Sequence, residues 1–220
     1  MKKITLLSWS SGKDSAWALH TLRQNPEIEL VGLFCTVNQE FSRVAMHGVR
    51  TELLQRQAQA AGLPLHIIYI PYPCSNEQYA QVMSEFVEQA KSDGVTHFAF
   101  GDLFLEDVRR YREEHLQGTG ITPVFPLWGA NTVELSQTMV AVGLKSVLTC
   151  VNPKQLPKAF AGRTFDAALL RDLPQDVDPC GENGEFHSFA FAGPMFAQPI
   201  PFTIGETVER DGFVFTDLVS

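Results

Sequence analysis

Short apolar runs alternate with amphipathic segments over the first two thirds of the chain. The apolar runs predict strands over residues 4–9, 30–37, 65–70, 96–100 and 145–151, and the amphipathic segments predict helices over residues 14–24, 47–61, 75–92, 105–115 and 133–142. Each predicted helix lies between two predicted strands, as βα crossovers require. The pattern therefore predicts an α/β fold in which a parallel sheet is flanked by helices.

Several of the predicted helices have recognisable ends. Gly62, followed by Pro64, ends the second helix, and Gly94 ends the third. Ser75 and Gln78 have the spacing of a capping box, in which each side chain bonds the backbone N–H of the other residue.

The pattern changes after about residue 152, where Pro, Gly and Phe are frequent and regular segments are short. Residues 207–218 predict two short strands around the turn Asp211-Gly212. We expect a main domain over residues 1–116 and a smaller α+β portion over residues 117–220 that closes a cleft against it.

Composition narrows the classes of function. The chain has 220 residues and a net charge of −8, which argues against a broad surface for nucleic acid. Its apolar runs fall short of the roughly 20 residues needed to cross a bilayer, so we expect a cytoplasmic protein with no membrane partner. The four cysteines form no Cys-x-x-Cys pair and are expected to be reduced thiols. The oligomeric state stays open, a homo-oligomer included.

The first predicted strand runs directly into the polar turn SSGKDS, residues 10–15, and then into a helix. Such a turn points free backbone N–H groups and the positive end of the helix dipole at an anion. Serine hydroxyls add donors, Gly12 allows close approach, and Lys13 supplies a charge for phosphate. The turn is not a Walker A loop, because the earlier glycine of that pattern is missing. The alternative is an ordinary βα turn in which Ser10 or Ser11 caps the helix and Lys13 is solvated.

Two later segments also carry polar side chains. Gly101 and Asp102 follow a predicted strand, at the edge of a parallel sheet where ligands bind. Asp102 could coordinate a metal or orient a nucleophile there, whereas the arginines and glutamates that follow could form a solvated helix face. Residues 178–188 (DPCGENGEFHS) crowd carboxylates, an amide, a histidine and a thiol together. This segment could bind a substrate, or could be a hairpin turn with its acids in water.

The turn at residues 10–15 resembles the PP-loop, Ser-Gly-Gly-x-Asp-Ser, of the N-type ATP pyrophosphatases. Ser11 stands where that motif has its second glycine, a change expected to be tolerated as long as the φ angle of Ser11 is negative. Together with Gly101-Asp102 and the run from Gly181 to His187, the chain resembles the diphthine-ammonia ligase (diphthamide synthetase) family and looks like a bacterial-type relative. Asp107-Val108-Arg109 departs from the Tyr-Gln-Arg of members that act on diphthine, so the resemblance leaves the acceptor open.

The resemblance implies a Rossmann-like sheet of the adenine nucleotide alpha hydrolase (HUP) type. It also implies an amidation-type ligase that cleaves ATP to AMP and pyrophosphate through an adenylated acceptor, with ammonia or another amine as the second substrate. ATP and Mg²⁺ are the implied cofactors, and Asp14 is the implied Mg²⁺ ligand. His47, with Gly48, is a candidate neighbour of the adenine. The remaining roles that follow are ATP binding by Ser10, Ser11, Gly12, Lys13, Asp14, Ser15 and Gly101; catalysis by Lys13, Asp14, Asp102, Glu182 and Glu185; and acceptor binding by Asn183, His187 and Arg109.

Two other functions fit the same turn. A PP-loop enzyme could modify or thiolate tRNA, with Cys180 or Cys150 carrying sulfur, although the acidic balance of the chain argues against it. A sensor could bind ATP without turnover, and Ser11 is the feature that would favour it.

Overall fold

The computed structural model describes residues 2–44 and 46–220. The elements in chain order are β1 (Lys3–Ser8), α1 (Lys13–Arg23), β2 (Ile28–Asn38), β3 (Arg43–Val44), α2 (Thr51–Ala61), β4 (Leu65–Ile70), α3 (Asn76–Ser92), β5 (His97–Ala99), α4 (Glu106–Leu116), β6 (Thr122–Val124), α5 (Thr132–Ala141), β7 (Lys145–Val151), a short 3₁₀ turn (Lys158–Phe160), β8 (Thr164–Phe165), α6 (Ala167–Asp172), β9 (Phe186–Ala192), β10 (Thr203–Arg210) and β11 (Phe213–Val219).

The first sheet, sheet A, holds β4, β2, β1, β5 and β6 in parallel, in that spatial order. The two-residue strand β3 adds an antiparallel pair to the end of β2. The chain moves outward from β1 through β2 to β4 and then crosses to β5 on the other side of β1, so β1 and β5 flank a topological switch point. The predicted Rossmann-like α/β fold is confirmed, and ligands bind at such switch points, beyond the carboxyl ends of the strands.

The second sheet, sheet B, is antiparallel, with the order β10, β11, β7, β8 and with β9 also paired to β7. The prediction that residues 145–151 extend the parallel sheet is wrong. This segment is β7, which pairs antiparallel with β8, β9 and β11. The alternating pattern specified the strand but not its partner, because β9 and the long hairpin β10–β11 come later in the chain. Residues 207–218 do form the predicted hairpin, with longer strands.

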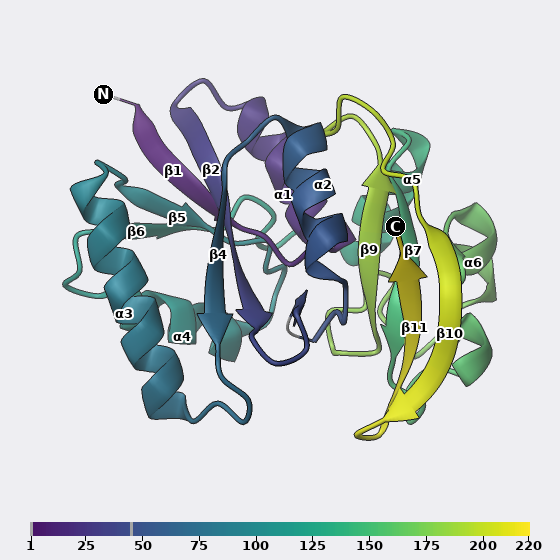
Figure 1. The fold of residues 1–220 in the computed structure, drawn as a ribbon. Coiled ribbons are helices and arrows are strands. Elements are labelled where there is room, and N and C mark those ends of the chain that lie inside the picture. Colours follow the sequence, from purple (N-terminus) through teal and green to yellow (C-terminus); the bar gives the residue numbers. More distant parts are fainter. Residues whose placement is uncertain (1, 45) are drawn as a thin grey trace.

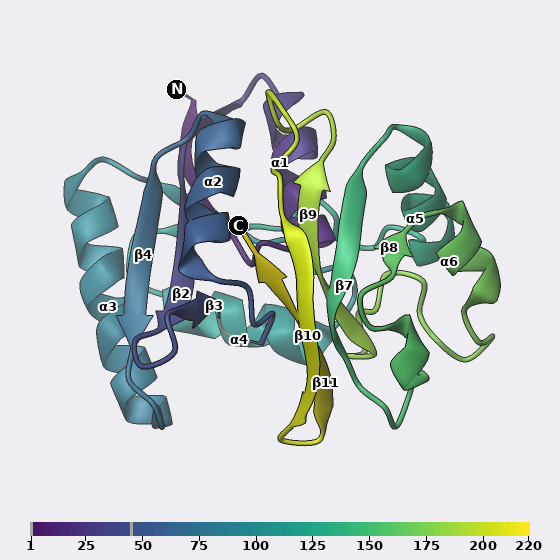
Figure 2. The same ribbon diagram turned by 45° about the vertical axis from the view of Figure 1, so that its right-hand side comes forward.

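Helices α1 and α2 lie between the two sheets, α3 covers the opposite face of sheet A, and α5 and α6 cover the outer side of sheet B (Figures 1 and 2). Ala16, Ala18 and Leu19 are fully buried because most of α1 is covered, whereas Arg23 at its end is exposed. One hydrophobic core joins residues of both sheets around α1 and α2, and a second core packs sheet A against α3 and α4. The loop that precedes α1 is therefore held between the two halves of the molecule.

The helix ends agree with most of the local signals. The Ser75–Gln78 capping box is present, and Gly62 ends α2 in the left-handed conformation (φ 64°). Helix α2 begins at Thr51 and not at residue 47, because the chain just before Thr51 returns to β3, where Arg50 forms an antiparallel bridge with Arg43. Strand β6 pairs with β5, so sheet A extends past residue 116, while the division of the chain into two domains stays a prediction.

No helix in residues 2–44 or 46–220 is both long and apolar enough to span a bilayer. The four cysteines are free thiols, as predicted.

Candidate active site

The SSGKDS turn connects the carboxyl end of β1 to the first turn of α1, beside the switch point of sheet A. Gly12 is the N-cap residue of α1, and no side chain of the turn caps the helix there. Ser188, which lies on β9, does so instead: its Oγ accepts the backbone N–H of Lys13 at 3.1 Å. The alternative in which Ser10 or Ser11 is a simple helix cap is therefore not what the structure shows.

The φ angle of Ser11 is +69°, in the left-handed region that favours glycine. The condition under which serine was expected to be tolerated here, a negative φ, is therefore not met. The Ser11 side chain is buried, and its hydroxyl has no hydrogen-bond partner among the described residues. The serine thus occupies a backbone conformation that suits the glycine of the PP-loop motif, at a cost of about 1–2 kcal/mol.

The buried side chain of Gln57 fixes the turn from the α2 side. Its Nε2 donates to the carbonyl oxygens of Ser11 (2.9 Å) and Ala190 (2.7 Å), and its Oε1 accepts the indole N–H of Trp9 (2.9 Å). The backbone N–H of Ala190 also donates to the carbonyl of Ser11 at 2.9 Å. Strand β9 and helix α2 therefore hold the turn together.

His47 packs against the glycine of the turn. A Cβ atom on Gly12 would lie 2.7 Å from Cε1 of His47, so only glycine fits while the imidazole is there. The ring of His47 lies 4.7 Å from that of His187, and its Nδ1 donates to the carbonyl oxygen of Ser188 at 3.0 Å. Burial, together with the nearby charge of Lys13, lowers the pKa of His47 to about 4. Burial and the nearby His47 and Lys13 lower the pKa of His187 to about 3. Both imidazole rings are therefore neutral near pH 7.

Lys13 points into the contact between the turn and residues 178–188. Its ammonium bonds the carboxylate of Asp14 (2.8 and 3.0 Å) and the carbonyl oxygen of Cys180. It also lies 5.6 Å from the ring centre of Phe165 and 5.2 Å from that of Phe186. Burial is the largest single influence and would lower the pKa of Lys13, but the charge and hydrogen bond of Asp14, together with the nearby Cys180 and Glu182, outweigh it, and the pKa is raised. Lys13 is not solvated and links the turn to the C-terminal half of the molecule.

Gly101 lies against the opposite side of the turn, beyond the end of β5. A Cβ atom there would come within 3.1–3.2 Å of the backbone of Asp14 and Ser15, where little movement is possible. The next residue, Asp102, is partly buried, and its Oδ2 lies 3.6 Å from Nε of Arg112, within ion-pair range but too far for a hydrogen bond. Burial raises the pKa of Asp102 despite Arg112.

Glu182 brings the third motif to the same place. Its Oε1 accepts the backbone N–H of Leu103 at 2.8 Å, directly after Asp102. Burial raises the pKa of Glu182 to about 7, and the carboxylates of Asp14 and Asp102 add to this rise. Three acidic side chains from three separate segments therefore surround the start of α1.

Glu185 and Asn183 hold their own loop. The buried carboxylate of Glu185 accepts the backbone N–H of Asp178 (2.9 Å) and the amide of Asn183 (3.2 Å) through Oε1. Its Oε2 is buried, and no hydrogen-bond donor for it lies in the described part of the chain. A simple hairpin turn would leave its acids in water, whereas here Glu185 is buried and Asp178 and Glu182 are partly buried.

Arg109 is directed toward the connecting stretch after β6. Its guanidinium lies 4.9 Å from the ring centre of Phe125 and 4.7 Å from that of Trp128, and its Nε bonds Glu113 at 2.8 Å. Arg112, one turn later on α4, lies 4.8 Å from the ring centre of Phe100 and lines the cavity described next.

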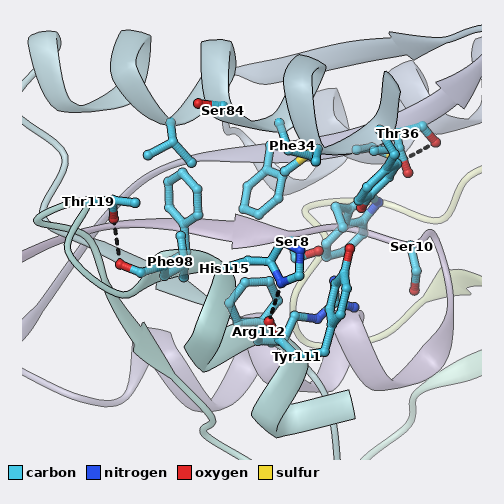
Figure 3. Close-up of a pocket in the computed structure, with 18 of the residues that line it drawn as sticks. Ser8, Ser10, Phe34, Thr36, Ser84, Phe98, Tyr111, Arg112, His115 and Thr119 are labelled. Carbon is cyan, nitrogen blue, oxygen red and sulfur yellow. Dashed lines mark hydrogen bonds between the residues drawn. The ribbon is translucent and has the colours of Figure 1, made fainter. Parts of the chain in front are cut away.

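A cavity of about 240 Å³ lies between sheet A and helices α3 and α4 (Figure 3). We call it the sheet cavity. It begins at Ser8 and Ser10, at the end of β1. Aromatic rings supply much of its wall, and Arg112 adds a charged group. The aromatic residues are Phe34, Phe98, Phe100, Tyr79 and Tyr111. It thus joins the SSGKDS turn to an apolar space large enough for part of a nucleotide.

Several residues of the site carried no motif. Gln57 is the clearest, and its signal is a polar residue at a position that the apolar face of α2 otherwise fills with Leu53, Leu54 and Ala61. Ser188 and Arg112 stand beside motif residues but had no distinguishing pattern of their own. The contact of Ser188 depends on the packing of β9 against α1, and those of Arg112 on the packing of α4 beside the end of β5.

Two family models match the chain. The one described as diphthamide synthase N-terminal domain matches residues 1–122, and the one described as diphthamide synthase C-terminal domain matches residues 131–214. A protein of Schizosaccharomyces pombe named diphthine–ammonia ligase is 28% identical over 111 residues, which cover 48% of this chain and 18% of that protein. A Danio rerio protein of the same name is 25% identical over 186 residues, covering 80% of this chain and 70% of that protein. The chain thus spans less than a fifth of the S. pombe relative. Since the N-terminal model alone covers more than half of the 220 residues, the chain belongs to the diphthamide synthase family.

Proposed function

We propose that this protein is an ATP-dependent ligase that adenylates a carboxyl group, releases pyrophosphate, and passes the activated acyl group to ammonia or another amine. The observation that carries the proposal is the meeting of three motifs at the start of α1: Lys13 bonds Cys180 and Ser188, and Glu182 bonds Leu103 beside Asp102. The names of the two relatives, diphthine–ammonia ligase, support the ligase class.

The SSGKDS turn is proposed to bind the phosphates of ATP. Residues Ser10 to Ser15 and Gly101 surround the first turn of α1, where backbone N–H groups and the helix dipole favour an anion. The adenosine part is proposed to enter the sheet cavity, which begins at Ser10 and is lined by aromatic rings. At about 240 Å³ this cavity is smaller than most ligand sites, which suits a base and sugar with the phosphates outside.

The donor set fits Mg²⁺. The charge of Asp14 adds to the rise in the pKa of Asp102, and the charges of Asp14 and Asp102 add to the rise in the pKa of Glu182, so the three carboxylates lie close together. Oδ2 of Asp102 lacks a hydrogen-bond donor among the described residues. The described residues contain no group of three His, Cys, Asp or Glu side chains in metal-binding geometry, but Mg²⁺ bound with a nucleotide uses one or two carboxylates plus phosphate oxygens and water. Asp14 and Asp102 are the proposed ligands, and the ion would neutralise phosphate charge.

The remaining residues are proposed to orient the acceptor and the amine. Glu182, with a pKa of about 7, can hold or release a proton near neutral pH and is the proposed base for the attacking amine. His187 is proposed to contact the acceptor, beside His47. Glu185 and Asn183 are proposed to position Glu182 by fixing the loop. Lys13 is proposed to hold the two halves of the site together while its charge offsets the phosphates. Arg109, which stacks on Phe125 and Trp128, is given no role in binding the acceptor.

Neither alternative function gains support from the structure. Cys150 and Cys180 are buried, and burial raises the pKa of both thiols, that of Cys150 to about 12, which opposes a role as sulfur carrier. The strained φ of Ser11 does not block the turn, because the backbone keeps the conformation that a glycine would take.

The test measures AMP and pyrophosphate from the purified chain with ATP, Mg²⁺, ammonium and a pool of small carboxylic acids. We expect acid-dependent formation of both products, and loss of at least a hundredfold in Asp14→Asn, since a charge that acts in phosphoryl transfer contributes about that much. Asp107→Asn is the matched control, because Asp107 is an exposed acid in the first turn of α4. ADP as the product, or an Asp14→Asn variant as active as the control, would contradict the proposal.

A further inference from the structure

A second cavity, of about 410 Å³, lies between the end of sheet A and the β10–β11 hairpin. We call it the hairpin cavity. One wall is formed by residues near the end of β2 and around β3, the turn after β4 forms another, and the hairpin closes the third side; the first wall consists of Asn38, Phe41, Arg43, Val44, Met46 and Gly48. In Figures 1 and 2 the β10–β11 turn and the turn after β4 extend toward the same lower end of the molecule. Its volume is within the range of about 300–1000 Å³ that is typical of small-molecule sites.

The wall of the hairpin cavity is mainly aromatic. Phe41, Tyr72, Phe213 and Phe215 come from three separate segments of the chain. Phe41 and Tyr72 meet edge to face with ring centres 5.1 Å apart, yet they are 44% and 55% exposed. Exposed aromatic rings that converge from distant segments indicate a surface for an apolar or flat ligand.

Two arginines and one acid, Asp211, line the hairpin cavity. Of the two arginines, Arg43 forms an ion pair with Asp217 (2.8 Å) and donates a hydrogen bond to the carbonyl oxygen of Gly48 (2.7 Å). Arg210 lies over Phe41 and Phe215, 5.7 and 4.9 Å from their ring centres. Its nearest acid within the described ranges is Asp211, at 3.8 Å and largely exposed. Stacked on two rings, the guanidinium leaves its N–H groups free for an anion.

The inner end of the hairpin cavity adjoins the site described above. Gly48, which follows His47, and Cys150, which pairs with His187 across β7 and β9, both line it. Val44 lines this cavity and the sheet cavity as well. A molecule here would therefore approach the SSGKDS turn from the His47–His187 side, opposite to a nucleotide in the sheet cavity.

We propose that the hairpin cavity binds the acceptor, and that the acceptor is a small flat or apolar acid with two anionic groups. One group binds Arg210, and the other is the carboxyl group that faces His47 and His187 and is adenylated. The assignment rests on the proposed function, because the ligation requires a carboxyl group. The aromatic wall selects the apolar body, and the stacked arginine selects the distant anion.

The test uses naphthalene-2,6-dicarboxylate as a fluorescent probe and its neutral diamide as the matched compound, titrated against the full chain. We expect the dicarboxylate to bind, the diamide to bind at least tenfold more weakly, and Arg210→Gln to weaken dicarboxylate binding about ten- to a hundredfold, as loss of a charge-assisted hydrogen bond implies. Arg163→Gln is the matched control, since Arg163 also stacks on a ring of the C-terminal half (Phe160, 4.8 Å) but lies outside the cavity. Tyr72→Ala should weaken the dicarboxylate and the diamide alike.

Three results would overturn the assignment: no binding of the dicarboxylate, equal binding of the two compounds, or equal affinity of Arg210→Gln and Arg163→Gln. Far-ultraviolet circular dichroism verifies that the variants are folded. ATP cleavage is measured separately, so the two proposals can fail independently. Selective binding without AMP formation would remove the ligase function alone, and AMP formation without selectivity would remove the acceptor site alone.

Discussion

Ser11 shows how a single residue can store strain in the SSGKDS turn. Its φ of +69° is disfavoured for any residue with a Cβ atom, and its buried hydroxyl finds no partner in residues 2–44 or 46–220. The neighbours Gln57 and Ala190 hold its carbonyl oxygen in place, so the backbone cannot relax.

Replacing Ser11 by glycine should therefore stabilise the protein. Relief of the left-handed conformation outweighs the entropy that glycine adds to the unfolded chain, so we expect Ser11→Gly to raise the free energy of unfolding by about 0.5–1 kcal/mol. Urea denaturation measures the change. Ser10→Gly is the control: Ser10 has no positive φ, its Oγ bonds Ser15 at 3.2 Å, and its loss should be destabilising. A less stable Ser11→Gly protein would show that the serine is not strained.

At the scale of elements, the turn depends on α2 and β9 more than on its own helix. Gln57 is fully buried and bonds Trp9, Ser11 and Ala190, so it connects β1, the turn and β9. No other side chain among the described residues makes all three contacts.

Gln57→Leu should destabilise the protein by about 2–4 kcal/mol, because the indole N–H of Trp9 and the carbonyl of Ala190 would be left buried without this partner. Chemical denaturation followed by Trp fluorescence measures the effect. Gln55→Leu is the matched control on the exposed side of the same helix and should change stability by less than about 0.5 kcal/mol. Equal effects of the two substitutions would mean that Gln57 does not hold the turn.

The sequence predicted most of these elements but not all of their partners. Periodicity located β1, β2, β4, β5 and β7 and five of the helices, because each buries a regular apolar face. It predicted no strand at β9, and without β9 the pairing of β7 could not be inferred. The three motifs were predicted as one site, and the structure brings them together at the start of α1. The contacts of Lys13, Gln57 and Ser188 depend on packing between residues more than 40 positions apart, which no local pattern encodes.

At the scale of the whole molecule, the site couples global stability to pH in two opposite ways. His47 and His187 have pKa values lowered to about 4 and 3, so the unfolded state takes up their protons first as the pH falls below about 6.5. The stability that the two neutral histidines contribute is thus fully present above pH 6.5 and is lost as the pH falls toward 4. Glu182 has a pKa raised to about 7, so its contribution is present below about pH 4.5 and is lost as the pH rises toward 7.

Between about pH 4.5 and 6.5 the two histidines bind more protons in the unfolded state, and the single glutamate binds more in the folded state. The free energy of unfolding of the wild-type protein should therefore decrease as the pH falls, with a slope that corresponds to roughly one proton. Glu182→Gln should make this slope steeper, and the double variant His47→Asn, His187→Asn should reverse its sign. Free energies of unfolding at pH 4.5, 5.5 and 6.5 measure the slopes. His66→Asn, at an exposed histidine of β4, is the control and should leave the slope unchanged. A double variant with the wild-type slope would show that the buried pair does not titrate on unfolding.

The Ser188 cap on α1 joins atoms that are 175 residues apart in the chain. While the protein is being synthesised, the first amide of α1 must therefore wait for β9 to leave the ribosome before it gains this acceptor. The SSGKDS turn, although it lies early in the chain, completes its hydrogen bonding only after residue 188 has been made.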